Sequence, residues 1–217
     1  MNLGVMKKIL LIGREFGSGA STVADKIARR LGWTLLDHAL PREIARLAHV
    51  SPDVCERLEE RVDPWLHRLV NIIWRGSFEQ NPPLSDMAVL DTDRLVSLIK
   101  QVIEQTIAAG PCVIVGRGAP YFLHDRADTL CVFLYASRER RFRRVLERAG
   151  NAAEATRLVD TMDEERRKFT KHYFGSEWSD RRFFDAMINT AIGDDATVEV
   201  IFHLLNTVNQ NEEAGKQ

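Results

Sequence analysis

Residues 14–22 combine glycines, hydroxyls and an arginine at a spacing that suits the binding of phosphate groups. The phosphate-binding pattern G-x-x-x-x-G-K-[ST] is matched in length by Arg14-Glu15-Phe16-Gly17-Ser18-Gly19-Ala20-Ser21. In that pattern the anion is held by backbone N–H groups and by the N-terminus of the next helix. Glycines contribute because their conformational freedom lets the backbone N–H groups point at the anion. We therefore predict a site for ATP and Mg²⁺, with the Ser21 hydroxyl meeting the metal. The predicted phosphate-binding residues are Gly17, Ser18, Gly19, Ala20, Ser21 and Thr22.

Two positions depart from this pattern. Arg14 stands in place of the first glycine, and Ala20 stands in place of the lysine that normally brings positive charge to the β and γ phosphates. Arg14 is the nearest replacement cation, and it could fold over the phosphates or turn outward to pair with Glu15. We predict that Arg14 folds inward and partly replaces the lysine. The simplest alternative is a glycine-rich turn that binds no ligand.

The loop lies between a predicted strand and a predicted helix, as a phosphate-binding loop requires. Apolar residues run from Ile9 to Ile12, and apolar residues at helical spacing follow the loop as far as Gly32. Nearly continuous apolar strands are typical of a parallel sheet with helices on both faces, so we predict an α/β fold. Further strands are predicted at 33–36, 112–115, 130–135 and 186–189. Asp91 is predicted to cap a helix that reaches Ala109, and Ser137 to cap an arginine-rich helix. Further helices are predicted at 152–173 and 197–208, and a frayed tail at 209–217.

A dinucleotide-binding turn fits some of the same residues. Gly13, Gly17 and Gly19 have the spacing G-x-x-x-G-x-G, and Asp37 follows at the distance where an acid would bind the ribose of NAD. A short-chain dehydrogenase would also need a Tyr-x-x-x-Lys pair, which none of the three tyrosines provides. Residues 39–109 show only helical periodicity, where a third strand would be expected. An oxidoreductase is therefore the weaker alternative.

Composition and charge restrict the kinds of partner. The chain has 217 residues, 30 of them basic and 31 acidic, so no overall charge draws it to nucleic acid or to a membrane surface. No apolar run approaches the roughly 18 residues of a membrane span, and the run after Lys8 is too short for a secretion signal. Three widely spaced cysteines favour structural thiols in a reducing cytosol. We expect a cytoplasmic protein with a small-molecule partner and neither a nucleic acid nor a membrane partner.

Positive charge is concentrated in one segment despite the neutral total. Residues 138–148 hold six arginines against Glu139 and Glu147, a local net charge of 6 − 2 = +4. Arginine suits polyphosphate because its guanidinium binds oxygens in pairs and stays charged when buried. A solvated helix face with ion pairs four residues apart is the alternative for most of the six.

Two further candidates directly follow predicted strands. Asp37 comes after the strand at 33–36, and Arg117 follows the strand at 112–115 by one glycine. The carboxyl ends of strands in an α/β sheet form the crevice where ligands bind. We predict that Arg117 contacts phosphate or substrate and that Asp37 orients substrate or hydrated Mg²⁺. A structural ion pair for Arg117 and a helix cap for Asp37 are the alternatives.

Several segments, taken in order, resemble the nucleoside monophosphate kinases, and most closely the cytidylate kinase-like family. They span residues 7–205 and are found at 12–19, 35–37, 113–118, 135–141 and 163–166, and at Asp185, Asn189 and Thr190. The resemblance implies a P-loop NTPase-type core with a helical substrate-binding insertion and a small helical lid. By alignment it also places Arg141, Arg144 and Arg166 toward phosphate. Cytidylate kinases carry lysine where Ala20 stands and Gly-Arg-Asp at 116–118, so this chain departs from them at Ala20 and Gly118.

The resemblance also implies a domain organisation and a reaction. We expect one kinase-like domain over 1–217, with a core at 7–38, 96–136 and 183–208, the insertion at 39–95 and the lid at 137–182. The implied reaction is phosphoryl transfer from ATP to a small acceptor, most simply a nucleoside monophosphate such as CMP. A nucleotide-binding regulatory protein with little or no kinase activity is the alternative. The expected catalytic residues are Arg14, Asp37, Arg117, Arg141, Arg144 and Arg166.

Overall fold

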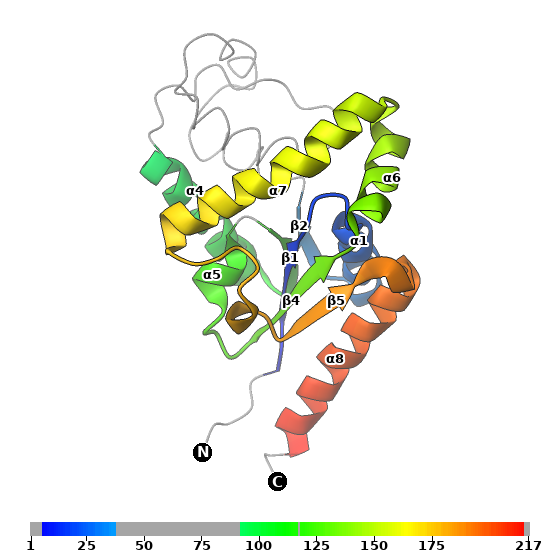
Figure 1. The fold of residues 1–217 in the computed structure, drawn as a ribbon. Helices are drawn as coiled ribbons and strands as arrows, with labels where there is room; N and C mark the ends of the chain where they lie inside the picture. Colours follow the sequence, from blue (N-terminus) through cyan, green and yellow to red (C-terminus); the bar gives the residue numbers. More distant parts are fainter. Residues whose placement is uncertain (1–5, 38–91, 117, 215–217) are drawn as a thin grey trace.

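A five-stranded parallel sheet forms the centre of the protein, in the order β2-β3-β1-β4-β5 (Figure 1). The computed structural model describes residues 6–37, 92–116 and 118–214. Every residue of β1 and β3 is buried, which explains why their apolar runs are not interrupted by polar residues. The strands are β1 (Ile9–Arg14), β2 (Thr34–Leu36), β3 (Cys112–Val115), β4 (Thr129–Tyr135) and β5 (Ala186–Asn189).

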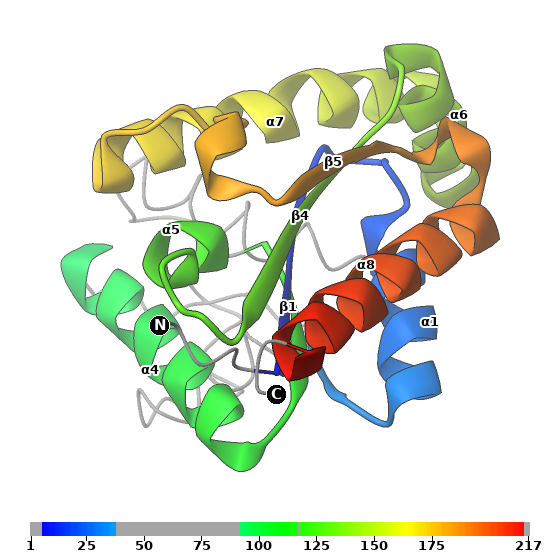
Figure 2. The same ribbon diagram turned by 90° about the horizontal axis from the view of Figure 1, so that it is seen from below.

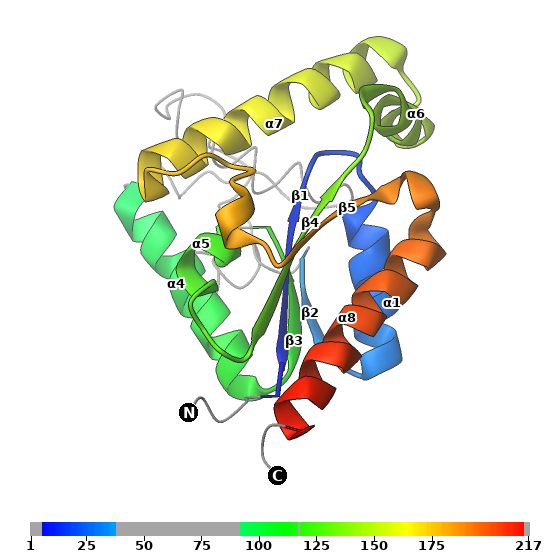
Figure 3. The same ribbon diagram turned by 60° about the horizontal axis from the view of Figure 1, so that its bottom comes forward.

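Helices cover both faces of this sheet, α1 and α8 on one and α4 and α5 on the other (Figures 2 and 3). The helices α6 and α7 pack against each other, and α7 crosses above the carboxyl ends of the strands (Figure 1). The bounds are α1 (Ala20–Leu31), α4 (Thr92–Ala109), α5 (Ala119–Leu123), α6 (Arg138–Ala149), α7 (Ala152–Phe174) and α8 (Asp194–Ala214), with short 3-10 helices η4 (Arg181–Phe183) and η5 (Thr190–Ile192).

The apolar core between the sheet and α1 fixes the start of the loop. Leu10 and Ile12 of β1 pack with Val23 and Ile27 of α1 and with Ile201 of α8. All five side chains are fully buried. The loop after β1 therefore begins and ends on rigid elements.

The strand order decides between the two glycine-turn alternatives. In the dinucleotide-binding fold the second strand lies beside the first. Here β3 lies between β1 and β2, and it pairs in parallel with both. The dinucleotide alternative is therefore wrong for this chain.

The predicted strands and helices are present within the described residues, but the structure adds the short helix α5 and begins α8 at Asp194 instead of 197. The strands β3 and β5 have the predicted bounds, and Ser137 caps α6 as its residue type indicates. The predicted frayed tail is wrong as far as Ala214, because α8 extends to that residue. Residues 209–214 contain no glycine or proline, and the first helix-terminating residue is Gly215.

Parts of the expected domain organisation lie outside the described residues. These parts are residue 38 of the core, all of the insertion at 39–95 except the first turn of α4, Arg117, and residues 1–5 and 215–217. The division into core, insertion and lid stays a prediction. Among the helices that the structure describes, none is long and apolar enough to cross a membrane.

Candidate functional site

The loop that joins β1 to α1 lies where the strand order reverses, because β1 is flanked by β3 and β4. Ligands bind at this crevice in open α/β sheets. Gly17 and Gly19 have φ values of 78° and 89°, which other residues rarely adopt. A Cβ on Gly17 would also lie 2.9 Å from the carbonyl oxygen of Arg141. The loop therefore requires these glycines, and α1 begins directly after Gly19.

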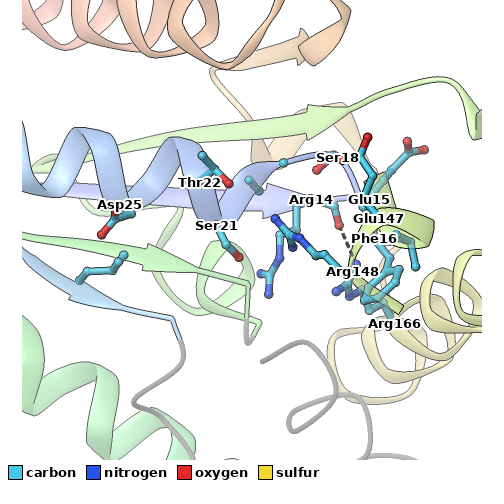
Figure 4. A pocket seen from close by; sticks show the side chains of 15 residues that line it. Arg14, Glu15, Phe16, Ser18, Ser21, Thr22, Asp25, Glu147, Arg148 and Arg166 are labelled. Atoms are coloured by element: carbon cyan, nitrogen blue, oxygen red, sulfur yellow. Dashed lines mark hydrogen bonds between the residues drawn. The ribbon is translucent and has the colours of Figure 1, made fainter. Parts of the chain in front are cut away.

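A pocket of about 700 Å³ opens beside this loop (Figure 4). Such a volume is typical of small-molecule sites. All six predicted phosphate-binding residues line it, as do three of the arginines that the structure describes. The lining residues are Arg14, Glu15, Phe16, Gly17, Ser18, Gly19, Ala20, Ser21, Thr22, Asp25, Leu35, Val145, Glu147, Arg148 and Arg166.

The Arg14 side chain reaches across the end of β3 toward β2. Its Nη2 atom lies 3.5 Å from Oδ1 of Asp37, and both side chains are more than nine-tenths buried. A Cβ on Gly116 would lie 2.3 Å from Nη1 of Arg14, so this glycine makes room for the guanidinium. Glu15 lies instead 3.2 Å from Nε of Arg141. The alternative in which Arg14 pairs with Glu15 is therefore wrong.

Asp163 of α7 connects two of the predicted arginines to the loop. Its carboxylate accepts hydrogen bonds from the backbone N–H of Phe16 (2.8 Å), from Nη1 of Arg141 (2.6 Å) and from Nη1 of Arg166 (3.1 Å). Nη1 of Arg166 also donates to the carbonyl oxygen of Arg14 at 3.2 Å. Asp163 was not among the predicted site residues. Its spacing of three residues from Arg166 on a helix is the sequence signal that could have identified it.

The guanidiniums of Arg14 and Arg166 thus lie in the crevice beside the carboxylates of Asp37 and Asp163. Burial lowers the pKa of Arg166 to about 10, and repulsion from Arg14 adds to the shift, while Asp163 and Asp37 oppose it. Arg166 therefore remains a cation at neutral pH, with Asp163 as its nearest opposite charge.

Arg144 of α6 contacts the loop at Ser18 and Gly19. Its Nη1 donates to the carbonyl oxygen of Ser18 at 3.0 Å, and its Nη2 pairs with Oδ1 of Asp194 at 2.7 Å. The Thr190 hydroxyl donates to the same Ser18 carbonyl at 2.8 Å. A Cβ on Gly19 would lie 1.4 Å from Nη1 of Arg144, so the guanidinium packs directly on this glycine. These contacts fix the loop backbone, and a phosphate contact by Arg144 stays a prediction.

The loop is also tied to α6 and α7 through an apolar cluster. Phe16 packs there with Val145 of α6 and with four residues of α7, which are Ala155, Leu158, Val159 and Met162. The segment predicted as a lid is therefore in contact with the loop through both apolar and charged side chains. Its movement as a lid stays a prediction.

The structure places five of the six predicted catalytic residues around the loop, and the sixth, Arg117, lies outside the described residues. Arg141 and Arg144 contact the loop backbone, whereas Arg14 and Arg166 also line the pocket. The sequence alone did not single out Arg148, although it lies four residues after Arg144 on the same arginine-rich helix.

Comparisons with known proteins agree with this geometry. The model of the cytidylate kinase-like family matches residues 9–192. A cytidylate kinase from Pyrobaculum aerophilum is 29% identical over 185 residues, 84% of each chain. Among solved structures, a protein from Eubacterium ventriosum has a TM-score of 0.63 at 22% identity, covering 92% of this chain and 99% of its own. A shikimate kinase from Acinetobacter baumannii has a TM-score of 0.52 at 16% identity, covering 94% and 96%. The two structures support the P-loop kinase fold.

Proposed function

The chain belongs to the cytidylate kinase-like family, and on that premise we propose that it transfers the γ-phosphoryl group of ATP to a small acceptor, most simply a nucleoside monophosphate such as CMP. It is a nucleotide-binding, kinase-like protein. The main support for the proposal is the pocket of about 700 Å³ at the carboxyl end of β1. It is lined by the glycine loop, the start of α1 and three arginines.

We place the triphosphate of ATP against the loop. The Ser18 hydroxyl is 1% exposed and has no hydrogen-bond partner among the described residues, whereas buried hydroxyls usually have one. A phosphate oxygen in the pocket would accept this hydrogen bond. A loop hydroxyl is a usual Mg²⁺ ligand beside the phosphate oxygens, and the half-buried Ser21 hydroxyl would be that ligand here. The ion would offset charge on the β and γ phosphates.

We place the acceptor beside Asp37 and Arg14, at the ends of β2 and β1. An oxygen of the acceptor phosphate attacks the γ-phosphorus, and the bond from that phosphorus to the β–γ bridging oxygen breaks, so that ADP leaves with the electron pair. No proton needs to move when the acceptor phosphate is ionised. Arg166 is held by Asp163 beside this crevice, and it would act on the charge of the transferred group through its electric field and not by direct contact. Arg141 and Arg144 would act by holding the loop, since their guanidiniums already have protein partners.

A nucleotide-binding regulatory protein is the second candidate, and two positions favour it. Ala20 is 2% exposed in the apolar core and brings no charge to the loop. Gly118, where cytidylate kinases carry Asp, has a φ of 75°. A Cβ on Gly118 would lie 2.9 Å from the Phe174 ring, so the fold itself opposes an acid there.

The test is a coupled assay of ADP release against a panel of nucleoside monophosphates, run beside direct measurement of ATP binding. ADP release that requires one monophosphate supports the kinase and identifies the acceptor. ATP binding without turnover favours the regulatory protein, and absence of ATP binding contradicts both. Since these functions require ATP, they also agree with the expected cytoplasmic location.

The Gly19→Val variant tests where the phosphates bind. The new side chain would displace the Arg144 guanidinium and strain the loop at a φ of 89°, so ATP affinity should fall at least tenfold, about 1.4 kcal/mol. The control is Gly32→Val, at a positive φ but with no atom within 4 Å of its Cβ. Unchanged ATP affinity in a folded Gly19→Val variant would contradict the proposed position.

A further inference from the structure

Of the described residues, three arginines line the pocket, and two of them are held by protein partners. Arg14 pairs with Asp37, and Arg166 pairs with Asp163. The third is Arg148, in the last turn of α6 (Figure 4). It is exposed and forms no hydrogen bond or ion pair with the part of the chain that the structure describes.

The face of α6 that carries Arg148 is directed toward the loop. Arg141, Val145 and Arg148 follow one another at intervals of four and three residues, so they share one side of the helix. That side touches the loop, because a Cβ on Gly17 would lie 2.9 Å from Cγ2 of Val145. Arg148 lies about one turn beyond this contact, on the wall of the pocket.

The acidic residues of the pocket leave Arg148 without a partner. Glu15 and Asp25 are paired with other arginines, at 3.2 and 3.0 Å. Glu147 is exposed beside Arg148, and no ion pair joins the two among the described residues. An anion entering the pocket would therefore meet Arg148 as an available cation. Arg14 or Arg166 could turn toward that anion only by leaving a buried carboxylate, which is strongly unfavourable.

We propose that Arg148 contacts the triphosphate of the donor nucleotide and brings the positive charge that a lysine at position 20 would have brought. This inference rests on the proposed function, since it assumes that the donor binds at the glycine loop. A guanidinium suits the role because it binds two phosphate oxygens at once and remains charged when covered. Arg148 reaches the loop from α6, whereas the usual lysine reaches it from the start of α1.

The experiment compares Arg148→Gln with Arg143→Gln. Arg143 is exposed on the same helix and does not line the pocket, so its variant removes the same charge elsewhere. Affinities for ATP, ADP and AMP are measured by calorimetry with Mg²⁺ present. Arg148→Gln should weaken ATP binding about tenfold, a difference of about 1.4 kcal/mol, and should change AMP binding less than twofold. Arg143→Gln should change none of the three by more than twofold. Arg148→Lys should keep part of the ATP affinity.

The outcomes separate this inference from the function on which it rests. If the unmodified protein binds no ATP, the proposed function itself fails. If that protein binds ATP and the two Gln variants behave alike, Arg148 has no phosphate contact, and the proposed function is not affected by that result. A cation in the last turn of a helix also stabilises the helix. Equal weakening of all three nucleotides together with a lower melting temperature would therefore assign Arg148 a structural role and overturn the inference.

Discussion

Replacing Asp163 by Asn should destabilise the protein strongly, because this carboxylate neutralises two buried arginines. The Asp163 side chain is 7% exposed, and those of Arg141 and Arg166 are 12% and 11% exposed. Removing one partner of a buried ion pair typically costs about 3–5 kcal/mol. The lower end applies here, since Asn keeps an oxygen for the Phe16 N–H and Arg141 keeps Glu15 as a second partner. We expect a loss of about 3 kcal/mol.

Arg166 accounts for most of this expected loss. Burial and the charge of Arg14 already lower its pKa, and Asp163 is the acid that contacts its guanidinium directly. In the Asn variant the buried charge retains the carbonyl oxygen of Arg14 as a hydrogen-bond partner but loses its nearest opposite charge. For a chain of this size about 3 kcal/mol corresponds to a melting temperature lower by about 6–12 °C.

The matched control is Asp160→Asn, one turn earlier on α7. Asp160 accepts two hydrogen bonds from Arg138, both 2.8 Å long, but both side chains are about half exposed. Exposed pairs of this kind contribute little to stability. Thermal and urea unfolding followed by circular dichroism measures both variants. Equal shifts in the two, or no shift for Asp163→Asn, would refute the reasoning that burial makes Asp163 important.

Two further outcomes follow from burial and backbone conformation. Burial raises the pKa of Cys112 to about 11 and also raises that of Cys131. Iodoacetamide at about pH 8 should therefore modify neither thiol until the protein unfolds. Rapid labelling of either thiol in the native protein, mapped by mass spectrometry, would contradict this. Gly118→Asp, which restores the acid of cytidylate kinases, should cost about 1–3 kcal/mol in urea unfolding without raising ADP release, since it strains a φ of 75° and crowds Phe174. Higher activity at unchanged stability would show that the Phe174 contact is not restrictive.

The elements of the core could be predicted because each leaves a local pattern in the sequence. The β3 run at 112–115 is apolar throughout, as a strand buried on both faces must be, and the glycines at 17 and 19 mark a turn that few other residues could form. The length of α8 was missed because the polar residues at 209–214 suggest fraying, although none of them terminates a helix.

The ion pairs of the site could not be predicted in the same way. Arg141 pairs with Asp163, and Arg144 pairs with Asp194 on α8. These partners are 22 and 50 residues apart, so no local spacing joins them. The sequence shows six arginines between 138 and 148 but does not show which of them are neutralised. Only the fold separates the arginines that hold the loop from Arg148, which lines the pocket without a partner in the described chain.

The contacts around the loop explain how the proposed phosphate site can keep its shape without the usual lysine. The carbonyl oxygen of Ser18 is held by Arg144 and Thr190, and the N–H of Phe16 is held by Asp163. None of these contacts involves the side chain at position 20, so the loop keeps its shape with alanine there. Phosphate binding depends on that backbone shape, whereas transfer depends on charge that develops at the γ-phosphoryl group. Loss of the lysine should therefore reduce turnover more than nucleotide binding, and the extent of the reduction depends on how well Arg148 and Arg166 meet that charge from α6 and α7.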